Sequence, residues 1–149
     1  MNVYLDNCCY NRPYDDQSQM RISLETQAKL YIQGLIREKQ ISLTASYVLE
    51  YENNENPYEM RQKSISDFIT SHASIYVDAS HHQEMTAKVD EIMATGIKYK
   101  DARHVACAIY AECDYFITTD KRLLKYPGDE IVMVNPVDFL EKLEVETHE

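Results

Sequence analysis

The sequence lacks the features that mark membrane and secreted proteins. No stretch approaches the roughly 20 apolar residues that a membrane-spanning helix needs. The N-terminal residues MNVYLDNCCY contain no basic segment followed by an apolar run of signal-peptide length. We therefore expect a cytoplasmic protein that does not bind a membrane.

Cysteines are few and lack the spacing of a metal site. Cys8, Cys9, Cys107 and Cys113 show neither the paired CxxC spacing of a zinc site nor the density of a disulfide-rich domain. This pattern favours buried or half-buried thiols in a reducing compartment.

Positive charge is also scarce. The chain has 15 basic and 25 acidic residues, so its formal net charge is -10. No overall electrostatic field draws such a protein toward phosphate or anionic lipid. A nucleic acid must then be held by a local site or through metal ions.

What the sequence does contain is an alternation of strand-like and helix-like segments, over a length (residues 1–149) that suits a single domain. Apolar runs rich in β-branched or aromatic residues predict five strands, at residues 3–5, 41–45, 74–77, 115–118 and 131–134. Helical periodicity appears between them, around residues 24–35, 65–69, 85–93 and 102–109. This alternation predicts an α/β fold with a mostly parallel sheet and helices on both faces, because parallel strands need long crossovers.

Local signals predict where some helices start. Ser46 precedes a helical segment, Ser80 begins a capping-box pattern, and Asn135 stands before a proline in a first helical turn. The polar stretch at residues 10–19 shows no periodicity and predicts a loop after the first strand.

Acidic residues fall where an open α/β sheet binds its ligands, outside the carboxyl ends of the strands. Asp6 follows the first predicted strand, and Asp120 follows the fourth. Glu50 lies in the first turns of the helix after the second strand, and Asp101 precedes the apolar stripe at residues 102–109. We expect these carboxylates to converge at one edge of the sheet.

The assignment of Glu50 has two alternatives, because Glu52 and Glu55 follow closely. Helix boundaries read from sequence err by several residues, and a slip changes which side chain faces the site. We favour Glu50. His104 follows Asp101 closely, but its place in a helix suits packing or surface exposure at least as well as a general base.

Clustered carboxylates call for cations. At surface-like dielectric, two carboxylates a few ångströms apart repel by about 1 to 4 kcal/mol. Hard oxygen ligands suit Mg²⁺ or Mn²⁺, which acidify bound water and neutralise charge on phosphoryl oxygens. The sequence therefore predicts metal-assisted phosphodiester hydrolysis, with Asp6, Glu50, Asp101 and Asp120 as metal ligands and catalytic residues.

These residues resemble the pattern of the PIN-domain family of metal-dependent nucleases, in which an acid follows the first strand, a Glu lies on the next helix, and two Asp residues come later. The resemblance spans nearly the whole chain and rests on VYLDN for Asp6, SYVLE for Glu50, KDARHVACA for Asp101 and FITTDKRLL for Asp120. It implies a PIN-like three-layer α/β/α domain with a central, mostly parallel, five-stranded sheet.

The resemblance also implies an activity and partners. PIN nucleases use Mg²⁺ or Mn²⁺ and usually cleave RNA, so an endoribonuclease is expected. Many are toxins neutralised by a partner antitoxin, and paired subunits imply a homodimer. This sequence departs from many members by carrying Asn7, where a small hydroxyl residue often follows the first acid.

Polar residues beside the acids are candidates for supporting roles. Asn7, Thr118 and Thr119 are expected to orient ligands or bind water. Six basic residues flank the acidic positions and are candidates for phosphate contacts: Arg12, Lys98, Lys100, Arg103, Lys121 and Arg122. Of these, Arg12 and Lys121 are the ones expected to bind the substrate.

Two other functions remain open at this stage. One is a catalytically weak or inactive PIN-like module that binds RNA or a protein, suggested by the strong acidity and by Asn7. The other is phosphotransfer through an aspartyl phosphate on Asp6. Cys8 stands where haloacid-dehalogenase-type enzymes carry a second Asp, which argues against the latter.

Overall fold

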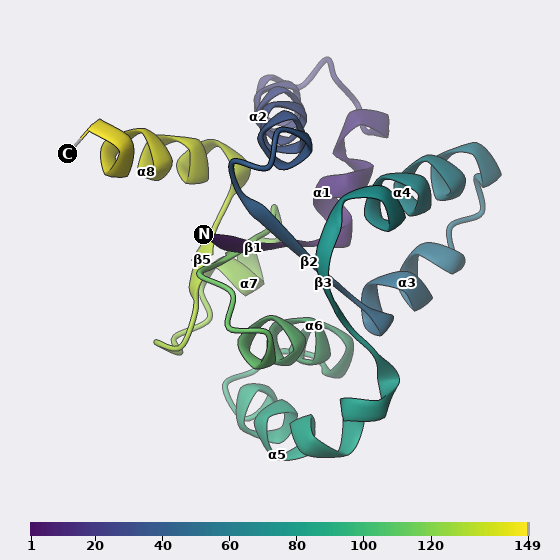
Figure 1. The fold of residues 1–149 in the computed structure, drawn as a ribbon, viewed down its shortest axis with the longest axis vertical. Coiled ribbons are helices and arrows are strands. Elements are labelled where there is room, and N and C mark those ends of the chain that lie inside the picture. The colour runs from purple at the N-terminus through teal and green to yellow at the C-terminus, as the bar shows by residue number, and fades with distance from the viewer. Residues whose placement is uncertain (149) are drawn as a thin grey trace.

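The computed structural model describes residues 1–148 and shows a central sheet with helices on both sides (Figure 1). The strands are β1 (Asn2–Leu5), β2 (Ser42–Ser46), β3 (Ala73–Val77), β4 (Tyr115–Ile117) and β5 (Val132–Val134). The helices are α1 (Asn7–Asn11), α2 (Met20–Arg37), α3 (Tyr47–Asn54), α4 (Glu59–His72), α5 (His82–Met93), α6 (Tyr99–Tyr110), α7 (Lys121–Leu124) and α8 (Pro136–His148), with short 3₁₀ turns η1 (Arg12–Tyr14) and η2 (Ala79–His81). Within these residues, no helix is long and apolar enough to cross a membrane.

The sheet has five strands in the order β3-β2-β1-β4-β5, and every neighbouring pair is parallel. The predicted strands and the predicted parallel α/β architecture are therefore confirmed. β1 lies at the centre, with β2 on one side and β4 on the other. From β1, the order of strands runs in one direction through β2 and β3 and in the other through β4 and β5. In open α/β sheets, a crevice forms at such a switch point, outside the carboxyl ends of the strands.

Each face of the sheet packs against its own hydrophobic core. Alternate side chains of β1 point to opposite faces: Val3 and Leu5 belong to one core, and Tyr4 belongs to the other. In Figure 1, α2, α4 and α8 lie on the side opposite α5 and α6. β1 is buried on both faces, which explains why its sequence reads as a continuous apolar run.

Two of the three predicted helix caps are confirmed. Ser46 Oγ accepts a hydrogen bond from the Leu49 amide at 3.2 Å, and Asn135 Oδ1 accepts one from the Asp138 amide at 2.8 Å. The capping box at Ser80 is wrong. Asp78 caps the η2 turn instead by accepting from the Ser80 amide at 2.9 Å, and α5 begins only at His82.

The predicted loop at residues 10–19 is partly wrong, because α1 and η1 occupy its first half. Asp6 caps α1 by accepting from the Asn7 amide at 2.8 Å. Cys9 and Tyr10 then bury their side chains completely in the core. The capping acid and these two anchors stabilise a helix too short to show a periodic pattern in the sequence.

Candidate metal site and active-site cleft

An acidic cleft of about 590 Å³ lies at the carboxyl ends of β1 and β4. Three of the predicted acids, Asp6, Asp101 and Asp120, line it together with Glu52. The remaining lining residues are Asn7, Cys8, Asn11, Asp15, Lys98 and Lys100. The cleft thus combines converging carboxylates with two lysines at the switch point of the sheet.

Asp6 is held in a fixed orientation beneath this cleft. Its side chain is only 5% exposed. Oδ1 accepts from the Asn7 amide at 2.8 Å, and Oδ2 accepts from Thr118 Oγ1 at 2.8 Å and from Cys8 Sγ at 3.4 Å. Both carboxylate oxygens therefore have donors, which fixes the position of the carboxyl group.

Thr118 links Asp6 to Asp120. Its hydroxyl donates to Asp6 and accepts from the Asp120 amide at 3.0 Å. Asp120 Oδ1 in turn accepts from the Arg122 amide at 2.8 Å and caps α7. Thr119 is buried, and its amide lies 3.4 Å from Cys8 Sγ. The residues after β4 therefore include Asp120 itself and Thr118, which holds Asp6 by a hydrogen bond. Thr118 thus lies where its expected supporting role requires it.

Asp101 experiences the charge of its neighbours. It lies in the first turn of α6 and is partly buried. Burial raises the pKa of its carboxyl group, and the negative charges of Asp6 and Asp120 raise it further. Burial and the neighbouring negative charges both disfavour the ionised form of Asp101, and a bound cation would offset both effects.

Glu52 is the acid that α3 contributes to the cleft. Lys100 Nζ lies 2.7 Å from its Oε2, and His104 Nε2 lies 3.6 Å from its Oε1. Burial acts to raise the pKa of Glu52, but His104 and Lys100 outweigh it and lower that pKa to about 2. One oxygen each of Asp6 and Glu52 and one ring nitrogen of His104 lie within 4.8 Å of one another.

The structure does not bring Glu50 to this cleft, which corrects the placement favoured from the sequence. Glu50 is exposed and accepts a hydrogen bond from the Tyr76 hydroxyl of β3. It lines a separate pocket of about 270 Å³ between α3, α4 and β3. Successive helical residues are about 100° apart, so Glu50 and Glu52 point to nearly opposite sides of α3.

His104 is a component of the site that sequence reasoning set aside. It is fully buried, and its Nδ1 lies 2.6 Å from the Tyr4 hydroxyl, which also contacts Ser46 Oγ at 2.7 Å. Its Nε2 is buried, has no hydrogen-bond partner among the described residues, and lies 3.6 Å from Glu52 Oε1. One feature of the sequence could have indicated this role: His104 comes three residues after Asp101, and that spacing places both side chains on one face of α6.

Arg12 and Lys121, the two basic residues expected to bind the substrate, do not line the cleft. Arg12 binds Glu25 at 2.6 Å and Asp15 at 3.0 Å, so its charge is already neutralised. Lys121 is exposed at the start of α7 and does not line the cleft. Two of the other basic candidates, Lys98 and Lys100, do line the cleft.

The donor set fits a hard divalent cation. Asp6, Asp101 and Asp120 supply carboxylate oxygens, with Glu52 beside them, and such oxygens suit Mg²⁺ and Mn²⁺. Burial and the charges of Asp6 and Asp120 raise the pKa of Asp101, as expected for a site completed by positive charge.

Comparison with known proteins supports the fold. No family model and no curated protein matches the chain by sequence. The chain is similar to a chain in the crystal structure of VapBC2 from Rickettsia felis bound to a DNA fragment from their promoter, with a TM-score of 0.59 and 15% identity. The match covers 91% of this chain and 98% of that chain. At this identity the likeness bears on the fold alone, and the expected PIN-like α/β/α architecture is confirmed.

Proposed function

We propose that this protein is a Mg²⁺- or Mn²⁺-dependent endoribonuclease of the PIN type. The observation that carries the proposal is the convergence of Asp6, Asp101, Asp120 and Glu52 in one cleft at the switch point of the sheet. Four carboxylates in one cleft repel one another, and a bound cation would offset that repulsion. Cations held in this way commonly catalyse the hydrolysis of phosphodiester bonds.

Within this proposal, Asp6, Asp101 and Asp120 hold the metal, with Glu52 and His104 beside them. A divalent cation there supplies an acidified water and neutralises charge that develops on the phosphoryl oxygens. Thr118 and the Asn7 amide keep Asp6 oriented toward the cleft. Because no covalent nucleophile is needed, the protein's contribution is position and electrostatics.

Substrate is held locally, since the chain as a whole repels it. The net charge of -10 opposes approach of a polyanion. Lys98 and Lys100 place positive charge on the wall of the cleft. Lys100 is bound to Glu52, so it also limits the negative charge that the scissile phosphate meets. RNA is the substrate we propose, on the resemblance to PIN nucleases.

We also propose that the protein works with a partner antitoxin and as a homodimer. The resemblance to PIN toxins supports this, and so does an apolar surface on α2. Met20, Leu24 and Tyr31 are 78%, 49% and 63% exposed on that helix. Large exposed apolar side chains grouped on one element are typical of protein interfaces.

The direct test of the nuclease proposal is cleavage of labelled single-stranded RNA in Mg²⁺, Mn²⁺ or EDTA. We expect cleavage with either metal, none in EDTA, and none by an Asp6→Asn/Asp120→Asn double variant. Asp90→Asn, at an exposed position on α5, is the matched control and should retain full activity. Equal cleavage by the double variant would exclude the proposed site. Metal-independent binding of RNA without turnover would favour the binding module.

A further inference from the structure

A second polar cavity, of about 460 Å³, lies between α2 and α4 and is distinct from the acidic cleft. Lys29, Gln33 and Arg37 recur every four residues and form one stripe of α2 along it. Phe68 and His72 of α4 and Tyr10 of α1 also line this cavity.

The side chain of Lys29 is largely buried and, among the described residues, has no counter-ion. It is 5% exposed. Among the side chains that the structure describes, none forms an ion pair or hydrogen bond with it, and its Nζ lies 5.8 Å from the centre of the Tyr10 ring. Burial lowers the pKa of Lys29 to about 8, and the charge of Arg37 also lowers it. Lysines this deeply placed are usually paired, so an anion entering the cavity would supply the counter-ion that Lys29 lacks among the described residues.

Two neighbouring polar groups also lack partners. Gln33 is 5% exposed, and within the described part of the chain its side chain makes no hydrogen bond. The Tyr10 hydroxyl is buried and likewise unpaired. Buried polar groups in native proteins are nearly always satisfied, so the unpaired Tyr10 hydroxyl indicates that a polar ligand is missing beside it, and the Gln33 amide is free to donate to the same ligand.

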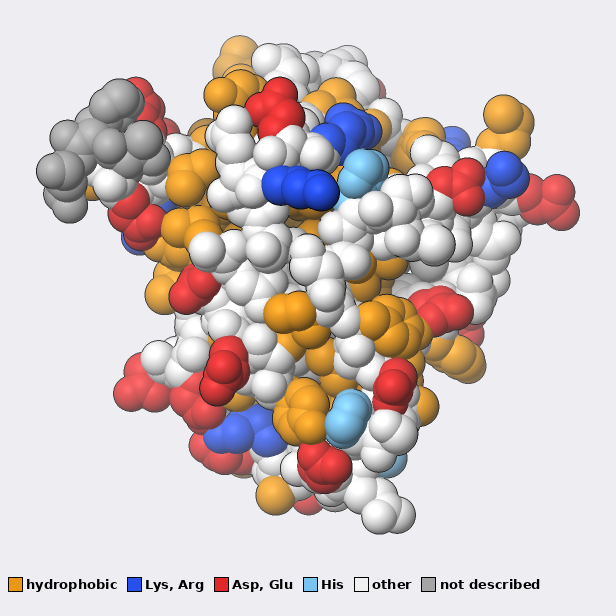
Figure 2. All heavy atoms as spheres, viewed as in Figure 1, with side chains coloured by type: hydrophobic (Ala, Val, Ile, Leu, Met, Phe, Trp, Pro, Cys, Tyr) orange, Lys and Arg blue, Asp and Glu red, His pale blue; other side chains and the backbone are white. Residues whose placement is uncertain are grey.

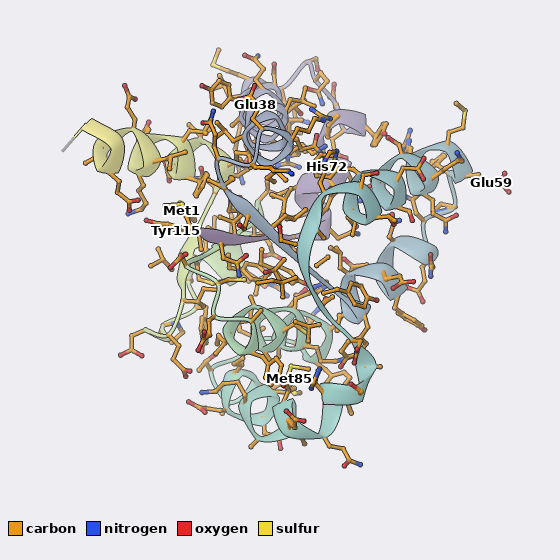
Figure 3. The ribbon with its side chains drawn as sticks, in the orientation of Figure 1. Met1, Glu38, Glu59, His72, Met85 and Tyr115 are labelled. Carbon is orange, nitrogen blue, oxygen red and sulfur yellow. The ribbon has the colours of Figure 1, made fainter. Side chains whose placement is uncertain are left out.

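The Arg37 guanidinium and the His72 imidazole flank the same space by packing against Phe68. The Arg37 guanidinium lies 5.2 Å from the Phe68 ring centre, and the His72 ring lies 4.8 Å from it. Figure 3 labels His72 where α4 ends, beside α2, and Figure 2 shows Lys, Arg and His side chains gathered there. The carboxylate lining the cavity, Asp67, is exposed and pairs with Lys63 at 3.5 Å.

We propose that the cavity between α2 and α4 is a binding site for a phosphate group. An ammonium, a guanidinium and an amide together offer more hydrogen-bond donors than one carboxylate can accept, whereas phosphate has more acceptor oxygens and up to two negative charges. The groups involved are Lys29, Gln33 and Arg37, with Tyr10 and His72 at the walls. The site is independent of the nuclease proposal, because none of these residues lines the acidic cleft.

An NMR titration of the full chain with inorganic phosphate tests the proposal, with sodium chloride added to match ionic strength. Phosphate should produce saturable shifts of backbone amides in α2 and α4. Lys29→Met and Arg37→Gln should each weaken binding about tenfold, as expected for loss of a charge-assisted hydrogen bond. Lys125→Gln removes one positive charge at an exposed position outside the cavity and should bind like the wild type.

A second arm identifies the source of the phosphate. The probes are a short RNA carrying a 5′-phosphate and the same RNA without it, both in EDTA. Shifts in α2 and α4 with both RNAs support the site as one for backbone phosphates. Shifts with only the first support a terminal phosphate, and shifts with inorganic phosphate alone support a free-phosphate site.

Three results would overturn the proposal. The first is the absence of saturable shifts in α2 and α4. The second is binding that both Lys29→Met and Arg37→Gln leave unchanged; Arg37 is exposed, so its variant should fold. The third is a poly-glutamate peptide that shifts these amides when phosphate does not, which would assign the cavity to an acidic protein partner.

Discussion

Glu50 and Glu52 are separated by one residue on α3, yet they line different pockets. Glu52 lies in the acidic cleft and binds Lys100 at 2.7 Å, whereas Glu50 accepts a hydrogen bond from Tyr76 on the edge strand β3. The phase of the helix sets this difference, because two residues correspond to about 200° of rotation. Of the two, only Glu52 is placed to share a cation with Asp6.

The pairing of Glu52 predicts how stability changes in acid. Its folded pKa of about 2 lies below its ordinary value of 4.5, so Glu52 stabilises the protein above that ordinary value. The contribution is lost as pH falls toward the folded pKa. After allowance for partial exposure it amounts to about 1 to 2 kcal/mol.

We therefore expect Glu52→Gln to lose less stability than the wild type between about pH 5 and pH 3. Urea unfolding at several pH values measures this, with Glu50→Gln as the matched control on the same helix. An identical pH dependence for Glu52→Gln and the wild type would show that the pair with Lys100 and His104 has no net effect.

For Asp101 we expect the opposite effect of ionisation on the free energy of unfolding. Burial and the charges of Asp6 and Asp120 raise its pKa, so its ionised form weakens the metal-free protein once pH exceeds that raised pKa. Asp101→Asn should stabilise the metal-free protein at neutral pH by about 0.5 kcal/mol, after allowance for partial exposure. The gain is modest because an acid in the first turn of a helix also interacts favourably with the helix dipole.

Added Mn²⁺ should make the wild type more stable than Asp101→Asn, the reverse of their order without metal. The wild type should gain thermal stability with Mn²⁺, because a ligand that binds only the folded state stabilises it, while Asp101→Asn should gain much less. Thermal unfolding with Mn²⁺ or EDTA measures both effects. An equal response of the two proteins to Mn²⁺ would remove Asp101 from the metal site.

Thr118 predicts a positioning effect, since its hydroxyl joins Asp6 to the Asp120 amide. Thr118→Val keeps the shape but removes the hydrogen bond to Asp6 and leaves the Asp120 amide without its acceptor, which costs about 1 to 3 kcal/mol. We expect weaker Mn²⁺ binding and slower RNA cleavage, with Thr118→Ser restoring both. Parallel metal titrations and cleavage rates measure this. If Thr118→Val matched Thr118→Ser in both, the hydroxyl would have no role in placing the acids.

Much of the framework is visible in the sequence because local physics determines it. Apolar strands buried on both faces and amphipathic helices leave strong periodic signals, and the ends of parallel strands meet at one edge. This is why Asp6 and Asp120, each just after a strand, and Asp101, in a first helical turn, were expected together. The structure places all three in the cleft.

The remaining features depend on tertiary contacts that no local pattern encodes. Arg12 is adjacent to the acidic region in sequence, but its partner Glu25 comes from α2. His104 belongs to the site because Tyr4 and Glu52, distant in sequence, meet it there. Lys29 is likewise buried because residues of α1 and α4 surround it, and the sequence of α2 alone does not show this.

The central claim is that the carboxylate cleft containing Glu52 cleaves RNA with a divalent metal. The most direct measurement compares cleavage of one labelled RNA in Mn²⁺ by wild type, Glu52→Gln and Glu50→Gln, purified in parallel. We predict that Glu52→Gln loses about 10²-fold or more in rate, as expected for a group that supports the charge at a metal site, and that Glu50→Gln retains the wild-type rate. Full activity in Glu52→Gln, with loss in Glu50→Gln, would contradict this location of the site.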